Sequence, residues 1–265
     1  MAAKKRKKRK VKKGFLLFSV ITGIILVLCL ALFVVVKYIP SVNILPVKQI
    51  SVTGDQVYPA EQIISASGLL SGKSVFKYNL NNLEKRLEKE LPYVKKATIS
   101  YSIDGTVNIE IVATEVSYSV KINDGYYNLD SDFKLLENLS QEKKGKLIYG
   151  VKITEEAQVG GIVVDENDSR VELLGRLTSK FNEFSIVTDV IDLEDTNNIL
   201  FVYKGRYLVE LGDDSKLEEK MMMFITIDKD LPENETGRIL LKLWGNDDRY
   251  SSVIAENIDK YINKY

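Results

Sequence analysis

Acidic side chains form the densest group of potentially catalytic residues in this sequence. Four of them fall within seven residues: Asp189, Asp192, Glu194 and Asp195. Glycosidases use two carboxylates held at a set separation in a cleft, so this group invites that interpretation. Histidine is absent and the single cysteine, Cys29, lies in an apolar stretch, which removes His-based triads, His-ligated zinc and thiolate metal sites. Carboxylate-only chemistry stays open.

The ordinary interpretation of the same acidic group is a solvated loop after a strand. Closeness in sequence does not place two carboxyl groups in one cleft, and charged side chains normally stay in water. We therefore predict a protein that is not an enzyme, with no catalytic, cofactor-binding or metal-binding residues and no small-molecule substrate. A cell-surface carboxylate-based wall-modifying enzyme is kept as the alternative.

An uncharged apolar stretch lies far upstream of these residues. Residues 15–36 carry no charge, and a helix of these 22 residues measures roughly 33 Å against a bilayer core of about 30 Å. Nine basic residues precede it: Lys4, Lys5, Arg6, Lys7, Lys8, Arg9, Lys10, Lys12 and Lys13. Because positive residues stay on the cytoplasmic side, we predict one membrane-spanning helix with a cytoplasmic N-terminus and residues 38–265 outside the cell.

Three other interpretations of the apolar stretch fit less well. A cleaved signal peptide has an apolar core of about 7 to 15 residues and a small-x-small cleavage site, which Tyr38-Ile39-Pro40 does not offer. A lipoprotein anchor would use Cys29, but Leu28 stands where a small residue is expected. A buried core helix would lack the basic block. That block is expected to set topology and attract anionic lipid rather than to bind nucleic acid.

Charge and hydropathy divide the chain into six segments. They are a basic cytoplasmic tail (1–14), a transmembrane helix (15–36), a linker (37–46), a first outer domain (47–115), a strand-rich β domain (116–245) and a polar C-terminal tail (246–265). Residues 37–265 hold 28 of the 37 basic residues and all 37 acidic ones, so the outer part is acidic although the whole chain is neutral. Pro40 and Pro46 stop the membrane helix from continuing into the linker.

The first outer domain is expected to have the order strand, helix, helix, strand, strand. Residues 47–53 alternate as a strand, and Pro59 suits the first turn of a helix. Asn79 can cap a second helix that Pro92 ends, and Asp104-Gly105 is a strong hairpin turn. The first strand cannot reach the hairpin by a tight turn, so the two helices must form the crossover and cover one face of a small mixed sheet.

Strands dominate the second domain. Helical patterns at 171–184 and 215–227 interrupt a series of short strands, of which residues 237–244 form the last. The tail 246–265 is polar and is expected to be loose, with a short helix that has Ile254, Ile258 and Tyr261 on one face as the alternative. The fold class is therefore predicted as α+β, with a single N-terminal transmembrane helix, a β-α-α-β-β domain and a strand-rich β domain with two helices.

Several motifs in the first domain resemble those of one family. They are Val52-x-Gly54, Pro59-Ala60-Glu61-Gln62-Ile63, Gly72-x-Ser74-Val75-Phe76, Leu91-Pro92-Tyr93-Val94-Lys95-Lys96-Ala97 and Val107-Asn108-Ile109-Glu110-Ile111. With the order of parts, they resemble the bacterial division protein family FtsQ/DivIB, whose first outer module is a POTRA domain. The resemblance covers roughly residues 1–245, and the long basic tail is similar to the Gram-positive branch, DivIB. Phe133 stands where the family commonly has the glycine of an Asp-x-x-Gly turn.

The resemblance implies a scaffold in the divisome, concentrated at the division septum. Its partners would be small coiled-coil division proteins of the FtsL and FtsB/DivIC type, with septal wall synthases as further contacts. A membrane-anchored receptor is the remaining alternative, but residues 1–14 are too short and uniform to hold a docking sequence.

The resemblance also places the partner on the last strand of the second module, which corresponds to residues 237–244. A terminal strand leaves backbone groups that a partner segment can pair with as an added strand. The predicted partner-binding residues are Arg238, Ile239, Leu240, Leu241, Lys242, Leu243 and Trp244, with Tyr203 and Tyr207 beside them. Ile239 and Leu241 are expected to face the core, and Trp244 either anchors the partner or closes the core.

Overall fold

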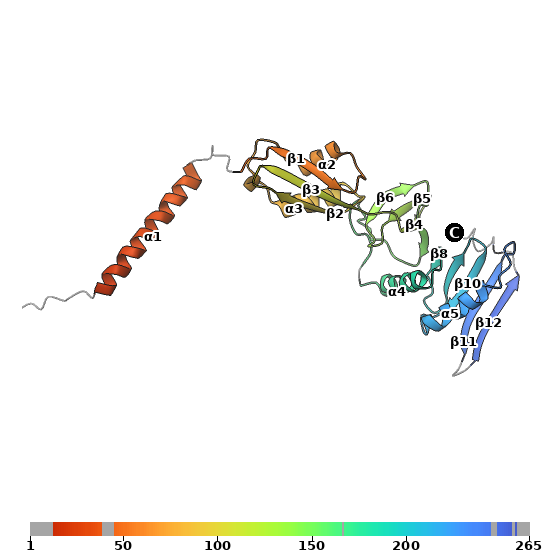
Figure 1. The fold of residues 1–265 in the computed structure, drawn as a ribbon. Helices are drawn as coiled ribbons and strands as arrows, with labels where there is room; N and C mark the ends of the chain where they lie inside the picture. Colours follow the sequence, from red (N-terminus) through yellow and green to blue (C-terminus); the bar gives the residue numbers. More distant parts are fainter. Residues whose placement is uncertain (1–12, 39–44, 166, 245–247, 256–257, 259–265) are drawn as a thin grey trace, which may run out of the picture.

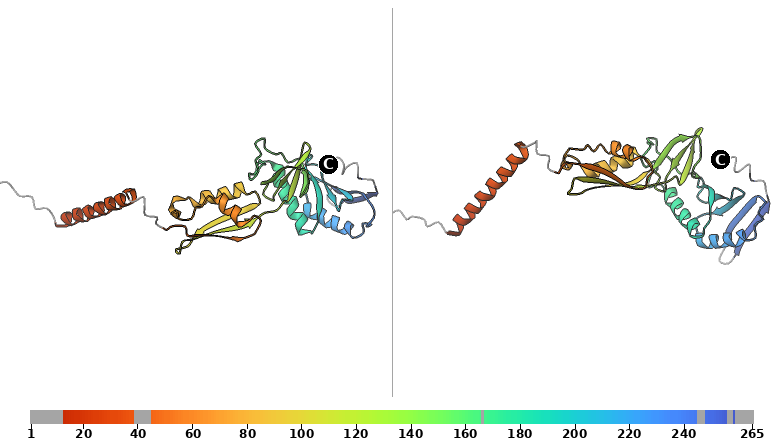
Figure 2. Two further views of the ribbon diagram at one scale, coloured as in Figure 1. Left: turned by 90° about the horizontal axis from the view of Figure 1, so that it is seen from above. Right: turned by 45° about the horizontal axis from the view of Figure 1, so that its top comes forward.

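The computed structural model describes residues 13–38, 45–165, 167–244, 248–255 and 258 (Figure 1). Three parts follow one another along the chain (Figures 1 and 2). They are an N-terminal helix, a small domain of two α-helices and three strands, and a larger strand-rich domain. The predicted α+β class, with one apolar N-terminal helix, is confirmed.

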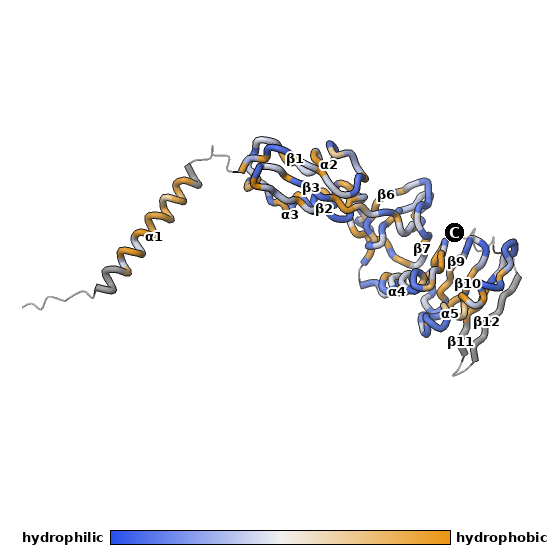
Figure 3. Tube along the Cα trace, in the orientation of Figure 1, coloured by the Kyte–Doolittle hydropathy of each residue, from blue (hydrophilic) through white to orange (hydrophobic). Residues whose placement is uncertain are grey.

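The N-terminal helix α1 (Lys13–Tyr38) extends beyond the predicted residues 15–36 at both ends. Its segment Phe18–Val35 has a mean hydropathy of 3.0, and none of it is buried against the rest of the protein. Figure 3 shows apolar residues along the helix without an opposing polar face. Among the described residues, α1 is the one helix long and apolar enough to cross a membrane. A helix that is apolar all round requires an apolar environment, and a bilayer provides one.

The small domain has the predicted order of elements. They are β1 (Gln49–Gly54), α2 (Ala60–Ser67), the 3₁₀ turn η1 (Val75–Lys77), α3 (Leu80–Glu90), β2 (Val94–Tyr101) and β3 (Thr106–Ala113). The sheet order is β1-β3-β2, with β1 parallel and β2 antiparallel to β3. The side chain of Asn79 caps α3 by accepting a hydrogen bond from the backbone N–H of Asn82. Ile63 and Leu87 from the helices pack with Ile109 from β3 in one buried cluster.

The larger domain contains one continuous sheet of nine strands. Its elements are β4 (Tyr118–Ile122), β5 (Gly125–Leu129), β6 (Leu135–Ser140), β7 (Lys146–Tyr149), α4 (Ser169–Glu183), β8 (Thr188–Asp192), β9 (Ile199–Tyr203), β10 (Tyr207–Gly212), α5 (Leu217–Asp228), β11 (Gly237–Trp244) and β12 (Asp248–Ala255). The strand order is β12-β11-β10-β9-β8-β7-β4-β5-β6. The sheet therefore begins beside the small domain with β4–β6 and ends at the β11–β12 hairpin (Figure 1).

The nine-stranded sheet buries apolar side chains on both faces. On one face Phe181 of α4 and Phe224 of α5 pack on Phe201 of β9, with ring centroids 5.0 and 5.5 Å from that ring. The opposite face carries a smaller cluster that includes Val202, the neighbour of Phe201, because successive strand side chains point to opposite faces. Ile258, which is 1% exposed, belongs to this second cluster and packs on the sheet.

The C-terminal segment differs from the sequence-based expectation. Residues 246–265 were expected to form a loose polar tail, whereas residues 248–255 form β12, which pairs antiparallel with all eight residues of β11. The reason is hairpin pairing: β11 offers a full strand edge, and β12, which begins four residues after β11 ends, satisfies its backbone groups despite a polar sequence. Strand β11 is thus internal to the sheet, and β12 is the terminal strand.

Candidate partner-binding site

Seven of the nine predicted site residues lie on β11, which pairs with β12 along its whole length and with β10 over its first four residues. β11 pairs in parallel with β10 from Tyr207↔Gly237 to Glu210↔Leu240, and antiparallel with β12 from Gly237↔Ala255 to Trp244↔Asp248. The expectation that residues 237–244 are the terminal strand is therefore wrong, because β12 of the same chain pairs with the edge of β11 at which a partner was expected. The edge that β11 was expected to offer belongs instead to β12.

The side chains of β11 alternate between the two faces of the sheet. Ile239 and Leu241 are fully buried in the main core, as expected. Arg238 and Leu240 are half-buried and point to the opposite face, where Arg238 Nη1 donates to Glu210 Oε1 at 2.9 Å. The side chains of Lys242, Leu243 and Trp244 lie outside the part of the chain that the structure describes.

The two tyrosines expected beside the partner lie in the core. Tyr203 and Tyr207 face each other across the β9–β10 hairpin and are 6% and 1% exposed. The Tyr203 hydroxyl donates to Asp228 Oδ2 at 2.9 Å, and that of Tyr207 donates to the carbonyl of Pro232 at 3.1 Å. Burial raises the pKa of Tyr203. The expectation of a surface role is corrected: α5 and the segment after it cover both rings.

The opposite end of the sheet is less accessible than β12. At the β6 edge, Leu135 N donates to the carbonyl of Gly161 at 2.9 Å, and Gly160 N donates to the carbonyl of Leu135 at 2.8 Å. These bonds occupy part of the β6 backbone. The eight-residue β12 therefore offers the longer unpaired edge among the described strands of this sheet.

A buried lysine joins the two outer domains. The Lys134 ammonium donates to the carbonyls of Glu88 at 2.5 Å and Val94 at 2.7 Å, both in the small domain. The Glu88 carbonyl lies in the last turn of α3 and has no helical partner, because Pro92 stands at i+4 and has no N–H. Burial lowers the Lys134 pKa, and the charges of Asp130 and Glu88 oppose that effect.

A tight turn directs the side chain of Lys134 towards the small domain. Asp130 Oδ1 accepts hydrogen bonds from the backbone N–H groups of Asp132 and Lys134, both at 2.9 Å. Phe133 takes a left-handed conformation with φ 61°, which glycine usually adopts, and its ring stacks on Tyr118 with centroids 5.4 Å apart. Stacking of this ring holds the turn without a glycine.

Glu137 forms a second contact across the joint. Its carboxylate accepts hydrogen bonds from the Tyr93 hydroxyl at 2.6 Å, Asn128 Nδ2 at 2.8 Å and Lys144 Nζ at 2.5 Å. Burial of the carboxyl acts to raise its pKa, but these hydrogen bonds outweigh burial and lower the pKa to about 2. Tyr93 belongs to the small domain, so the ionised form of Glu137 favours the joined arrangement.

We expect the joint to loosen at acid pH. A carboxyl whose pKa is depressed on folding stabilises the folded form above its ordinary pKa of 4.5, and that contribution is lost as the pH falls towards about 2. Hydrogen exchange at Tyr93 and its neighbours, followed across this window, measures the effect. Glu137→Gln should flatten the pH dependence there, whereas the exposed control Glu142→Gln should keep it. An unchanged profile in Glu137→Gln would contradict this assignment.

The acidic residues at 189–195, which suggested carboxylate chemistry, mainly accept hydrogen bonds from backbone N–H groups. Asp189 Oδ2 accepts from Gly205 N at 2.7 Å, and Asp192 Oδ1 accepts from Glu194 N at 2.9 Å. Asp195 Oδ1 accepts from Asn197 N at 2.9 Å. Three of the four carboxylates thus bind backbone N–H groups, the usual role of aspartate in loops.

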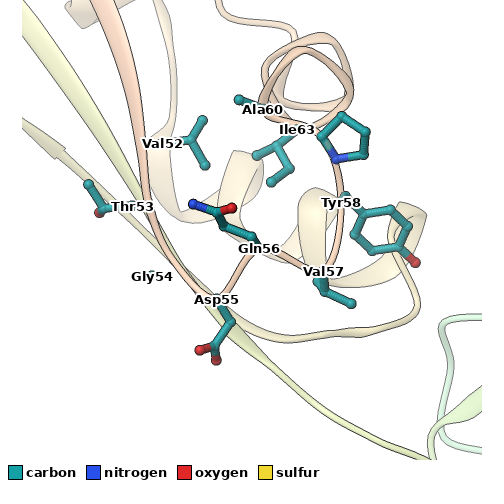
Figure 4. A pocket seen from close by; sticks show the side chains of 10 residues that line it. Val52, Thr53, Gly54, Asp55, Gln56, Val57, Tyr58, Ala60 and Ile63 are labelled. Carbon is teal, nitrogen blue, oxygen red and sulfur yellow. The ribbon is translucent and has the colours of Figure 1, made fainter.

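The small domain carries a hollow of about 660 Å³ between the end of β1 and the start of α2 (Figure 4). Apolar side chains such as Val52 and Ile63 form one wall, and Gln56 lies between them. Asp55 is the one acidic residue of its lining, and its Oδ2 accepts from the backbone N–H of Ala113 at 2.9 Å. The hollow therefore does not present the carboxylate pair that glycoside hydrolysis requires.

The family model and the curated relatives point to one kind of protein. A family model described as POTRA domain, FtsQ-type, matches residues 45–112. The chain is 23% identical to the cell division protein DivIB of Clostridium botulinum strain Hall, over 91% of this chain and 92% of that protein. It is 29% identical to DivIB of Clostridium acetobutylicum strain ATCC 824, over 77% and 79% of the two chains. Cell division protein FtsQ of Corynebacterium glutamicum strain ATCC 13032 is 22% identical, over 79% and 89%.

Proposed function

Because this chain belongs to the FtsQ/DivIB family of cell division proteins, we propose that it is a non-enzymatic scaffold of the bacterial divisome. It links small coiled-coil division proteins of the FtsL and FtsB/DivIC type and so supports septal wall synthesis. Helix α1 anchors it in the cell membrane with the basic tail in the cytoplasm, and the POTRA and β domains lie outside the cell. This orientation rests on the positive charges before α1.

The observation that carries the proposal is the outer edge of β12, with which no other described strand pairs. Strand β12 ends the nine-stranded sheet, and β11 occupies its other side over eight residue pairs. An extended segment of a partner can pair with the outer side of β12, so that main-chain hydrogen bonds give affinity and alternate side chains give selectivity. The residues Arg238–Trp244 then form the inner strand of the binding hairpin and hold β12 in place.

A second geometry keeps Arg238–Trp244 in direct contact with the partner. In it the partner segment takes the place of β12 on β11, at the position expected from the sequence. This exchange must first break the pairing of β12 with all eight β11 residues, whereas addition to β12 breaks none. We therefore favour addition to β12.

Truncation distinguishes the two geometries. A variant that ends at Trp244 lacks β12, and a matched control that ends at Ala255 keeps it. We expect the first variant to lose about tenfold or more of its affinity for the outer segment of an FtsB/DivIC-type partner, measured by titration, and the control to retain it. Tighter binding after truncation at Trp244 would support exchange on β11. Equal binding by both variants would contradict strand addition at this end of the sheet.

A proline in β11 is a poorer test. Leu240 pairs with Glu210 on one side and Ser252 on the other, so Leu240→Pro would disturb the chain's own sheet before it disturbed a partner.

Location in the cell tests the wider proposal. A fluorescent fusion at the N-terminus should concentrate at midcell in dividing cells, and protease added to intact protoplasts should digest the outer domains. A fusion spread evenly around dividing cells would contradict a divisome role, whatever the result with a purified partner.

A further inference from the structure

Three large apolar side chains project into solvent at one end of the POTRA domain. Leu70 is 58% exposed, Phe76 is 71% exposed and Ile103 is 92% exposed. Outside α1, among the residues whose exposure the structure describes, they are three of the four most exposed large apolar side chains, Val187 at 69% being the other. We call these three residues the apolar tip. Exposed apolar groups gathered in one place mark a binding surface.

The apolar tip lies where the chain arrives from α1. Val47 N donates to the carbonyl of Lys73 at 2.9 Å, and Gly72 N donates to the carbonyl of Val47 at 2.7 Å, which ties the loop of Leu70 and Phe76 to the first described residues after the linker. Lys48 N donates to the carbonyl of Gly105 at 2.8 Å, which ties the hairpin turn of Ile103 to the same residues. Figure 2 shows this end of the domain facing α1 and the other end meeting the β domain.

The linker is short enough to keep the apolar tip at the bilayer surface. Helix α1 ends at Tyr38 and the described POTRA chain begins at Leu45. Seven residue steps reach at most about 24 Å when fully extended. The headgroup layer on each side of the hydrocarbon core is several ångströms thick, so the apolar tip is held within easy reach of it.

The charge around the apolar tip is opposite to that of the outer region as a whole. Lys48, Lys73 and Lys77 are exposed on the segments that carry or contact the tip. The loop at residues 68–79 has no acidic residue, and the hairpin turn has one, Asp104, whose Oδ1 accepts from the Thr106 N–H at 2.9 Å. An otherwise acidic outer region thus presents apolar and basic side chains together at its membrane end. That combination fits an anionic lipid surface.

We propose that the apolar tip lies in the headgroup region of the bilayer that α1 spans. Leu70, Phe76 and Ile103 enter the boundary with the acyl chains, and the lysines contact lipid phosphates. The proposal rests on the proposed membrane anchoring and not on partner binding. A covalently tethered surface needs little intrinsic affinity, since the linker keeps its effective concentration high. The contact orients the POTRA domain on the membrane, and the joint at Lys134 passes that orientation to the β12 edge.

Site-directed fluorescence on the full chain in lipid vesicles tests the proposal. Cys29→Ser first removes the single native cysteine. Phe76→Cys, Ile103→Cys and a control, Val187→Cys, are then labelled separately with an environment-sensitive dye in vesicles of phosphatidylcholine and phosphatidylglycerol. Val187 is about as exposed as Phe76. We expect blue-shifted emission at positions 76 and 103, with quenching by headgroup-proximal spin-labelled lipid about twofold or more above that at position 187.

Charge variants test the lipid chemistry. Lys73→Glu combined with Lys77→Glu should reduce the quenching at positions 76 and 103 towards the level at position 187, as should vesicles of phosphatidylcholine alone. The exposed control Lys152→Glu should change nothing. If the quenching at positions 76 and 103 changes neither in the charge variants nor with the lipid composition, the anionic-lipid assignment is overturned.

Two results would overturn the proposal itself. One is equal, water-like emission at all three positions. The other is shielding of positions 76 and 103 only when other division proteins share the vesicles, which would make the apolar tip a protein-docking surface. Flotation of each variant with the vesicles checks the anchor separately, so failure of membrane anchoring is distinguishable from failure of the apolar tip.

Discussion

Lys134→Met is expected to lower the free energy of unfolding by about 4 kcal/mol and to loosen the POTRA domain from the β domain. Methionine keeps most of the aliphatic volume but removes the donors to the Glu88 and Val94 carbonyls. The Glu88 carbonyl has no helical donor to return to, because residue 92 is proline. The partly buried Glu88 carbonyl and the buried Val94 carbonyl then lose a charged donor at once, and each such loss costs roughly 1 to 3 kcal/mol.

Urea unfolding of the full chain in detergent micelles measures the change in stability, and hydrogen exchange near Glu88 and Val94 measures the loosening. Lys152→Met is the matched control, since Lys152 is an exposed lysine of the same domain, and it should change stability by less than about 0.5 kcal/mol. If both variants unfold alike, the ammonium of Lys134 does not hold the joint.

Gly160→Ala is expected to separate the same two domains by a steric route. A Cβ on Gly160 would lie 1.9 Å from the carbonyl oxygen of Lys89 in α3, and the residue has φ +85°, where a side chain is strained. Neither the helix backbone nor the turn can move without losing packing at the joint. We expect a loss of about 3 kcal/mol or more in the free energy of unfolding, the size typical of strain combined with lost contacts.

The neighbouring glycine supplies the control for this change. A Cβ on Gly161 would meet the Gln158 carbonyl at 3.3 Å, and this residue has no positive φ. Gly161→Ala should therefore leave the free energy of unfolding and the hydrogen exchange at Lys89 nearly unchanged. Similar behaviour of the two variants would show that the close approach at Gly160 does not shape the joint.

The POTRA domain was predictable because its signals are local. Asn79 caps α3 and Pro92 follows its end, as expected from residues a few positions apart. The Asp104-Gly105 turn joins β2 to β3, and alternation along both strands places Ile99 and Ile109 in the core. The comparisons agree with the resemblance that these motifs suggested.

The candidate site was less predictable because it depends on which strands end the sheet. The pattern at 237–244 correctly indicated a strand with Ile239 and Leu241 in the core. It gave no sign that residues 248–255, polar as they are, would pair along its whole length. Tyr203 and Tyr207 fit a strand on the surface as well as in the core, and only the position of α5 and the following segment decided their burial.

The sequence by itself determined the apolar helix, the helix caps and hairpin turn of the POTRA domain, and the α+β class, since hydrophobic periodicity and turn chemistry act between near neighbours. The tertiary structure alone decided the strand order, the terminal position of β12 and the joint in which Lys134 reaches the Glu88 carbonyl across 46 residues. The physical reason is that a backbone carbonyl without a partner in its own helix can accept a hydrogen bond from any donor that the fold brings close to it. The residues beside it in the sequence do not indicate which donor that will be.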